Sequence, residues 1–313
     1  MKTTRREMIA QAGAIAAAGI LAGNSAAAEA KSSATVSPQL RYCLNTSTIE
    51  GHRGKTPLAK EIDLIAKAGY NGIEPWIGEI QAFKESGGKL SEIKKQVDDY
   101  GMRVESAIGF ANWIVDDDAK RQQGLENLKR DMDLVRQIGG TRIAAPPAGG
   151  TREQLNLDRV AERYAEVLKL GKSMGVIPMV ELWGHSVTLH RLGELMYVAV
   201  ECGDADAAML LDVYHIYRGG SDFEGLNLVD GRAVKVLHMN DYPDIPREKI
   251  GDKDRVYPGD GVAPVPSILR TLVDAGFNGV LSLELFNPSY WKDDIEHVLA
   301  KGLKSMQEAF AQM

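Results

Sequence analysis

Cysteine is scarce in this sequence of 313 residues, where only Cys43 and Cys202 occur, far apart in the chain. Two distant cysteines cannot build a disulfide framework or a cysteine-based zinc site, so we interpret both as small buried hydrophobic side chains. An excess of positive charge is also missing, because 43 acidic against 37 basic residues give a formal net charge of −6. This balance argues against a protein that binds phosphate backbones, and we expect no nucleic acid among its partners.

Long hydrophobic runs are absent too, since no segment after the N-terminal region is apolar over about 18 residues, the length of a membrane-spanning helix. The apolar run at residues 9–22 is shorter than that and follows Thr-Arg-Arg-Glu-Met-Ile at 4–9, which resembles a twin-arginine signal. Small residues at 26–28 and 28–30 provide cleavage sites. We therefore expect residues 1–30 to be a cleaved signal peptide and residues 31–313 a periplasmic or secreted domain without stable membrane insertion. A lipid-anchored or uncleaved N-terminal helix is the alternative.

Short apolar runs alternate with longer amphipathic segments from residue 40 onward, and this pattern predicts βα units around a parallel sheet. Glycine repeatedly separates the end of an expected helix from the next expected strand, as at 68–72 and 275–279. The expected helices include residues 58–68, 90–100, 125–138, 157–174, 189–202, 265–275 and 295–310. The eight expected strands are residues 40–44, 72–74, 103–108, 142–145, 177–181, 209–212, 234–238 and 280–284.

Eight such units in one α/β chain predict a single (β/α)8 TIM barrel. A doubly wound open sheet is the main rival, but it commonly carries a glycine-rich phosphate loop after its first strand, and Leu-Asn-Thr-Ser at 44–47 is no such loop. The segment at 240–262 is the one extended loop, rich in proline, glycine and charge. Long loops on barrels tend to carry function.

Four polar residues close consecutive apolar runs, where a barrel places its active site: Glu181, Asp212, His238 and Glu284. Neighbouring strands would bring these side chains together, and three carboxylates cannot share a small pocket with an imidazole unless a cation balances them. Oxygen-rich ligation with one nitrogen suits Mn²⁺, Mg²⁺ or Co²⁺ better than a structural zinc, and Zn²⁺ stays open. Any one of the carboxylates taken singly could instead cap a helix or form a salt bridge. Their occurrence in four successive strands favours a metal site.

The later strands and their loops resemble the xylose-isomerase-like barrels, which include sugar-phosphate isomerases, ketose 3-epimerases and inosose-processing enzymes. The resemblance covers essentially the whole mature chain. It implies that Glu181, Asp212, His238 and Glu284 bind one divalent ion, with Glu181 and Glu284 also exchanging a substrate proton as an acid/base pair. The motifs that carry it are Val180-Glu181, Asp212-Val213-Tyr214-His215, His238-Met239-Asn240-Asp241, Arg255-Val256-Tyr257-Pro258-Gly259-Asp260-Gly261 and Glu284.

This ligand set suits proton abstraction next to a carbonyl, because a metal polarises the carbonyl and stabilises the enediolate. Two carboxylates on opposite faces would give epimerisation, and exchange on one face would give aldose–ketose isomerisation. A leaving group β to the carbonyl would make the enzyme a lyase or hydratase, for example on 3-keto-glycosides. The sequence does not choose among these outcomes, and we expect a non-phosphorylated carbohydrate substrate because no phosphate clamp is evident.

Three further residues are candidate substrate contacts. The resemblance places His215 over the metal and Arg255 against the substrate, with a structural histidine and a solvated loop charge as the alternatives. His185 lies on the loop after Glu181, where it could contact substrate or pack within the loop.

Aromatic residues after the second and third expected strands offer a further substrate surface. Trp76, Phe110 and Trp113 could form an apolar wall against a sugar ring, or ordinary rim packing. Glu74 could reach the pocket, whereas Glu105 is followed by more strand and could point elsewhere.

Two other classes of function compete with a sugar enzyme. A DNA repair endonuclease of the same superfamily would need extra metal ligands, yet the early strands end in Glu74, Ile108 and Ala145, and Asp260 is followed by Gly261 rather than by a ligand motif. A non-catalytic sugar-binding protein would not need two acid/base carboxylates. We therefore favour an enzyme, and the sequence leaves a homo-oligomer open.

Overall fold

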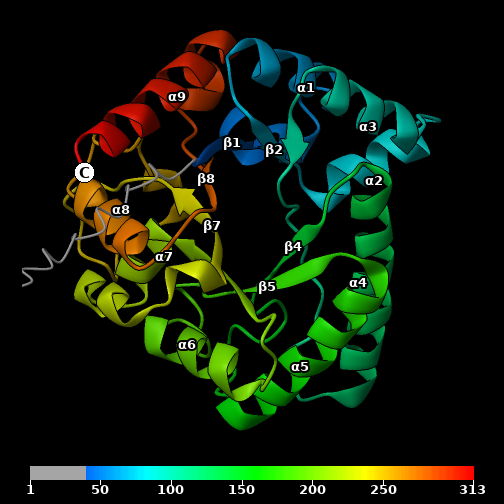
Figure 1. Cartoon of the computed structure of the whole chain (residues 1–313), viewed down its shortest axis with the longest axis vertical. Helices are drawn as coiled ribbons and strands as arrows, with labels where there is room; N and C mark the ends of the chain where they lie inside the picture. The colour runs from blue at the N-terminus through cyan, green and yellow to red at the C-terminus, as the bar shows by residue number, and fades with distance from the viewer. Residues whose placement is uncertain (1–39) are drawn as a thin grey trace, which may run out of the picture. The chain divides into compact units, whose positions relative to one another are not determined.

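Strands and helices alternate along residues 40–313, the part of the chain that the computed structural model describes, and the helices surround the strands (Figure 1). The expected signal peptide lies outside these residues. Within them, no helix has the length and apolar character needed to cross a membrane. The parallel strands are β1 (Arg41–Asn45), β2 (Gly72–Glu74), β3 (Arg103–Val104), β4 (Arg142–Ala145), β5 (Ile177–Glu181), β6 (Ala208–Asp212), β7 (Val234–Met239) and β8 (Val280–Leu283). The helices are α1 (Leu58–Lys67), α2 (Ile77–Glu85), α3 (Leu90–Asp99), α4 (Asp118–Gln137), α5 (Leu157–Met174), α6 (Leu192–Glu201), α7 (Val213–Arg218), α8 (Val265–Asp274) and α9 (Ile295–Ala311).

The eight strands form one curled sheet in the order β3-β2-β1-β8-β7-β6-β5-β4. Every paired ladder is parallel, from β1 with β2 through to β7 with β8. Strands β3 and β4 stand at the two ends of this order, and the Ala144 N–H donates to the Ala107 carbonyl at 2.9 Å across the seam between them. The predicted (β/α)8-barrel fold is confirmed.

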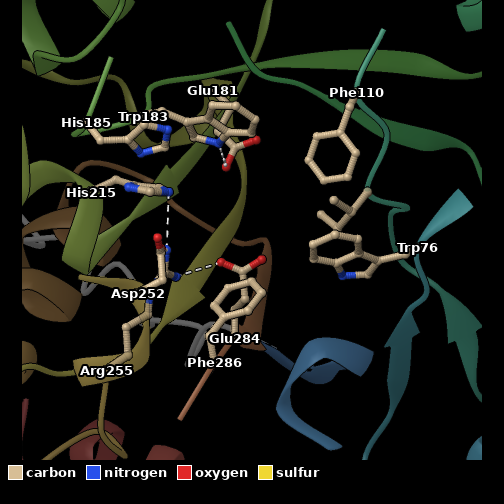
Figure 2. Close-up of a pocket in the computed structure, with 11 residues that line it drawn as sticks. Trp76, Phe110, Glu181, Trp183, His185, His215, Asp252, Arg255, Glu284 and Phe286 are labelled. Carbon is tan, nitrogen blue, oxygen red and sulfur yellow. Dashed lines mark hydrogen bonds and ion pairs between the residues drawn. The ribbon is translucent and has the colours of Figure 1, made fainter. Parts of the chain in front are cut away.

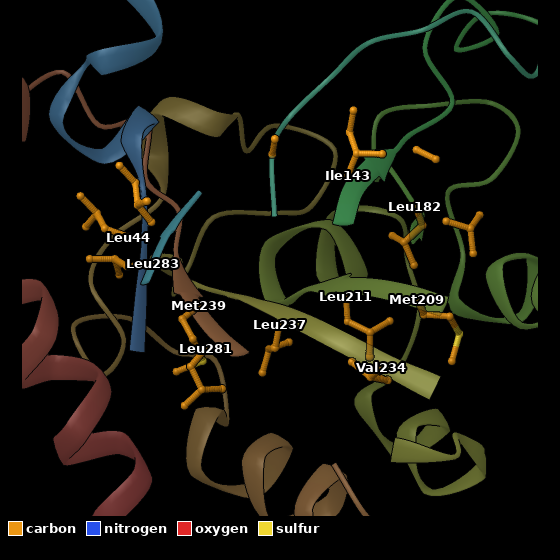
Figure 3. Close-up of a cluster of buried hydrophobic side chains, with 14 of the residues drawn as sticks. Leu44, Ile143, Leu182, Met209, Leu211, Val234, Leu237, Met239, Leu281 and Leu283 are labelled. Carbon is orange, nitrogen blue, oxygen red and sulfur yellow. The ribbon is translucent and has the colours of Figure 1, made fainter. Parts of the chain in front are cut away.

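Strand periodicity divides the side chains into two apolar layers. Residues such as Cys43, Met179, Leu210 and Val236 point inward and form a small cluster inside the barrel. Their sequence neighbours point outward and pack beneath the helices in the main core, which Figure 3 shows around Leu44, Ile143, Leu211, Leu237 and Leu281. The inward rows of β5, β6 and β7 continue at their carboxyl ends with Glu181, Asp212 and His238, so the same alternation that builds the core places the site.

Two details differ from the expected pattern. Strand β3 ends at Val104 instead of residue 108, and Glu105 turns to Arg41 and Arg142 at the opposite end of the barrel from the site, with N–O distances of 2.5 and 3.3 Å. Helix α7 has no counterpart among the expected helices, and neither has helix α2. It is only nine residues long, and the Glu79 carboxylate stabilises its first turn by accepting from the Trp76 N–H at 2.6 Å.

Two carboxylates, Glu61 on α1 and Glu79 on α2, are buried together behind the β1–α1 connection. Neither oxygen of Glu61, nor Oε1 of Glu79, has a hydrogen-bond partner among the described residues. A Cβ at Gly51 would collide with both carboxylates, which explains glycine there. Burial, with a contribution from the Glu79 charge, raises the pKa of Glu61 to about 9. Burial also raises the pKa of Glu79 to about 7.

We predict that Glu61→Gln removes a pH-dependent loss of stability. A carboxyl whose pKa rises on folding contributes full stability below its unfolded value of 4.5 and loses it as the pH rises through its folded value, here up to about 9. Between pH 5 and pH 9, the free energy of unfolding of the variant should therefore rise relative to that of the wild type. Thermal unfolding should show a difference on the order of 1–3 kcal/mol at pH 9. The exposed Glu92→Gln on α3 is the control. If the free energies of unfolding of wild type and Glu61→Gln changed with pH in the same way, ionisation of the buried Glu61 would not be the cause of the loss of stability.

Candidate active site

Three strand ends bring Asp212, His238 and Glu284 into one buried cluster. Asp212 pairs in register with His238, and His238 pairs with Ser282, two residues before Glu284. Each residue continues the inward row of its strand, so the side chains meet at the barrel mouth. One ligand atom from each of Asp212, His238 and Glu284 lies within 4.8 Å of the other two. The structure thus brings together three of the four predicted ligands.

His238 faces the centre of this cluster with its Nδ1 atom, which lies 3.1 Å from Glu284 Oε2 and 3.5 Å from Asp212 Oδ2. Its other ring nitrogen, Nε2, is held by Glu74 Oε2 at 2.9 Å. Burial alone would lower the pKa of His238, but the charges of Glu284 and Glu74 outweigh it and hold the pKa well above its ordinary value.

The donor set of the cluster fits a divalent cation. Nδ1 of His238 is buried without a hydrogen-bond partner in the described part of the chain, and it lies between two carboxylates. A carboxylate behind the far nitrogen of a ligating histidine is the usual arrangement for fixing the ring. Two carboxylates and one imidazole, with further carboxylates nearby, are ligands that suit Mn²⁺, Mg²⁺, Co²⁺ or Zn²⁺.

Glu181 lies in the same pocket but outside that three-residue group. It is 4% exposed, and Trp183 Nε1 donates to its Oε1 at 3.2 Å. Burial raises the pKa of Glu181 to about 8, and the nearby charges of Glu284 and Asp212 add to this rise. Glu181 is thus positioned across the pocket from Glu284, and its role as a fourth ligand stays a prediction.

Arg255 is buried and connects the carboxylates of the cluster. Its Nη1 donates to Asp212 Oδ2 at 2.8 Å and to Glu284 Oε2 at 2.7 Å, and its Nη2 donates to Asp252 Oδ1 at 2.6 Å. Burial alone would raise the pKa of Asp212, but the Arg255 charge and the neighbouring histidines, His215 and His238, together outweigh it and hold the pKa well below its ordinary value. The long loop predicted to be functional therefore delivers its guanidinium to the base of the pocket.

The two predicted histidine contacts both line the pocket. The backbone N–H of His215 is held by Asp212 Oδ1 at 2.8 Å, so one carboxylate starts helix α7 and also faces the cluster. Nδ1 of His215 accepts from the Gly184 N–H at 3.3 Å, while Nε2 lies 3.2 Å from Arg255 Nη2. Burial lowers the pKa of His215 to about 3, so the ring is neutral at physiological pH. The His185 ring stacks on Trp183 at 5.3 Å between ring centroids.

Aromatic rings form the opposite wall, as Figure 2 shows for Trp76 and Phe110 facing the charged residues across the pocket. The ring centroids of Trp76 and Phe110 lie 5.0 Å apart, and those of Phe110 and Trp183 lie 5.9 Å apart. The predicted substrate contact at Trp113 needs correction. Trp113 is 1% exposed, packs against Tyr164 and donates from Nε1 to the Pro146 carbonyl at 2.8 Å, so the loop after β3 places it in the core.

Three polar residues of the site escaped the sequence prediction as site residues. Asn45 ends β1 and donates from Nδ2 to Glu74 and Glu284, both at 3.0 Å. Asn240 lies 3.3 Å from both oxygens of Asp212, and Asp252 pairs with Arg255. The rule that found the ligands, a polar residue closing an apolar strand, would also have found Asn45. Asp252 lies in an irregular loop where no such rule operates.

Comparison with known proteins places this geometry in a family. The model of the Xylose isomerase-like TIM barrel family matches residues 62–309. The chain belongs to this family. An inosose isomerase from Bacillus velezensis is 26% identical over 86% of this chain and 96% of its own length. A fructoselysine 3-epimerase from Escherichia coli O157:H7 is 24% identical over 75% of this chain and 87% of its own length.

Two further likenesses extend the comparison. A 3-dehydroshikimate dehydratase from Pseudomonas putida is 21% identical over 80% of this chain but only 39% of its own length. The crystal structure of the IolI protein with a bound zinc atom superimposes with a TM-score of 0.79 at 21% identity, covering 87% of this chain and 99% of that one. The prediction of an enzyme from a xylose-isomerase-like family is therefore confirmed at the level of the family.

Proposed function

We propose that the protein is a divalent-metal-dependent isomerase or epimerase of a sugar or keto-sugar. The observation that carries this proposal is the convergence of Asp212, His238 and Glu284 on one point, with Glu181 in the same pocket. The cavity measures about 220 Å³ and is lined by both charged groups and aromatic rings. Polar groups that fix orientation within an otherwise apolar lining are typical of small-molecule sites.

Asp212, His238 and Glu284 would hold the cation, joined by Glu181 as a fourth ligand. When bound, the cation would polarise the substrate carbonyl and stabilise the charge that develops as the neighbouring proton leaves. Glu181 and Glu284 line the pocket from strands β5 and β8, which are three places apart in the sheet order, and proton removal and return on opposite faces of the substrate would give epimerisation. Trp183 positions the Glu181 carboxylate, Asn45 positions Glu284, and His215, His185 and Arg255 would contact the substrate oxygens.

A lyase that acts on 3-keto-glycosides by β-elimination is the second candidate. Its first step, removal of a proton next to a carbonyl, needs the same two carboxylates. The likeness to a dehydratase favours it, because dehydration is an elimination. The two functions differ in their products and not in the residues that start the reaction.

We also propose that the protein is exported by the twin-arginine route, on the basis of the motif at residues 4–9. Replacing Arg5 and Arg6 together with lysine should then leave the chain in the cytoplasm, unprocessed, as fractionation and mass measurement of the mature N-terminus would show. Unchanged export of the double variant would contradict this route.

The proposed function predicts about one divalent ion per chain and solvent exchange at a carbon next to a carbonyl. Metal analysis of the purified protein checks the first, and NMR in D2O with free ketoses, aldoses and 3-keto-glycosides checks the second. Deuterium in an isomerised or epimerised product would support the main proposal, and release of a leaving group would support the lyase. Metal-free protein with no exchange on any substrate would overturn both.

A further inference from the structure

A second hollow adjoins the candidate active site. It measures about 350 Å³ and shares Trp76, Ile108 and Phe110 with the catalytic cavity, so these side chains border both spaces. Its remaining lining comes from the first turns of α2, the middle of α4 and the loop after β3. Phe110 is 44% exposed and stands at the boundary, where Figure 2 shows its ring facing the catalytic side next to Trp76.

The second hollow is lined by groups that can bind a polar ligand. Gln81, Asn127, Arg130 and Asp131 all line it, and they include amide, guanidinium and carboxylate groups. Asp131 Oδ2 faces the bare backbone of Gly109, because a Cβ built there would lie 3.6 Å from that oxygen. Burial raises the pKa of Asp131 to about 6, and only the charge of Arg130 opposes the rise. No side chain among residues 40–313 donates a hydrogen bond to this carboxylate.

Two glycines keep the hollow open. A Cβ at Gly78, the second residue of α2, would meet nothing within 4 Å. A Cβ at Gly109 would lie 3.2 Å from Ile143 and 3.3 Å from Ile77, so a larger residue there would fit tightly against these two side chains. The hollow therefore has no side chain at two of its lining positions, and the exposed ring of Phe110 borders it.

We propose that this hollow is a second sugar subsite, which holds the non-reacting ring of a glycosidically linked substrate while the reacting ring lies in the catalytic cavity. The inference rests on the proposed function for the reacting ring. Aromatic faces against the apolar face of a ring, with carboxylate and amide groups on its hydroxyls, provide the contacts that a sugar needs. Trp76 and Phe110 border both spaces, and Phe110 is exposed at the boundary, so a linked substrate would pass over its ring to occupy both.

Filling the hollow tests the proposal, and the chain offers a matched control. Gly78 lines the hollow but not the catalytic cavity, and a Cβ there would meet nothing within 4 Å, so Gly78→Trp is designed to fill the hollow with an indole. Gly193→Trp makes the same change at the second residue of α6, another exposed helix start where a Cβ meets nothing within 4 Å. Asp131→Asn is a second variant, which removes the carboxylate but keeps the side-chain shape. Dissociation constants are measured by ligand-observed NMR titration with methyl 3-keto-glucoside and with gluco-disaccharides oxidised at C3.

The proposal predicts that wild type binds at least one keto-disaccharide more tightly than the methyl glycoside. Gly78→Trp should raise the dissociation constant of that disaccharide about tenfold or more, equivalent to about 1.4 kcal/mol. Asp131→Asn should also raise it. Gly193→Trp should leave the ratio of the two affinities unchanged. Equal affinities in wild type, or an unchanged ratio in both Gly78→Trp and Asp131→Asn, would overturn the subsite. Binding is independent of turnover, so absence of deuterium exchange would refute the proposed function separately.

Discussion

Glu181→Gln is expected to slow deuterium incorporation from solvent into the substrate by about 10²- to 10⁴-fold, the usual contribution of a positioned general acid or base. Glutamine keeps the size of the side chain and can still contact Trp183, which lies 3.2 Å from Glu181 Oε1. It cannot accept a proton at neutral pH. Metal content should fall less than in Glu284→Gln, because Asp212, His238 and Glu284 remain as three ligands and the glutamine amide oxygen can still face the ion.

Comparison with Glu284→Gln separates the two carboxylates. Glu284 belongs to the ligand cluster and also accepts from Asn45 and Arg255, so its substitution should lower metal content and rate together. Glu308→Gln on the exposed face of α9 is the control for loss of a surface charge. Unchanged exchange rates in both Glu181→Gln and Glu284→Gln would refute the acid/base pair.

His238→Ala is expected to abolish stoichiometric metal binding, with a loss of affinity greater than about 100-fold. Substitution of outer-shell partners alone costs about 10- to 100-fold, and His238 supplies the only nitrogen of the cluster. The substitution also leaves Glu74 without its 2.9 Å partner in the barrel interior. Metal analysis after dialysis, with thermal unfolding measured on the same samples, checks the prediction and confirms that the variant is folded.

His297→Ala provides the matched control, since His297 is a largely exposed histidine on α9 whose removal should change neither metal content nor exchange rate. Asp212→Asn extends the test without a change in size, and should lower metal affinity while keeping the helix-starting contact to the His215 N–H. Full metal content in both His238→Ala and Asp212→Asn would show that the cluster is not the metal site.

The ligand cluster could be predicted from sequence because it follows from strand periodicity. An inward row that begins with Val236 must place His238 inward as well, and the same holds for Leu210 and Asp212. Asn45 obeys this rule, and its omission was avoidable. The strand assignments other than the length of β3 agree with the structure for the same reason, because short apolar runs are local signals.

The positions that sequence could not predict lie in irregular segments. Trp113 lies in the loop after β3, where its indole is buried and donates to the Pro146 carbonyl. The loop has no periodic sequence pattern from which this placement could be predicted. The salt bridge between Asp252 and Arg255 likewise depends on how the loop at 240–262 folds over the mouth. Helix α2 is short and contains Gly78, so its pattern is weak, although its Glu79 carboxylate stabilises the first turn.

The order of the strands places the ligand cluster and the aromatic wall on different parts of the sheet. Asp212, His238 and Glu284 follow β6, β7 and β8, which have neighbours on both sides. Trp76 and Phe110 follow β2 and β3, near one end of the sheet order and beside the seam. Insertions and substitutions near that end can reshape the aromatic wall while the ligand-bearing strands keep their register. A lineage could therefore acquire new substrates by remodelling one flank of the barrel, with its proton chemistry inherited intact.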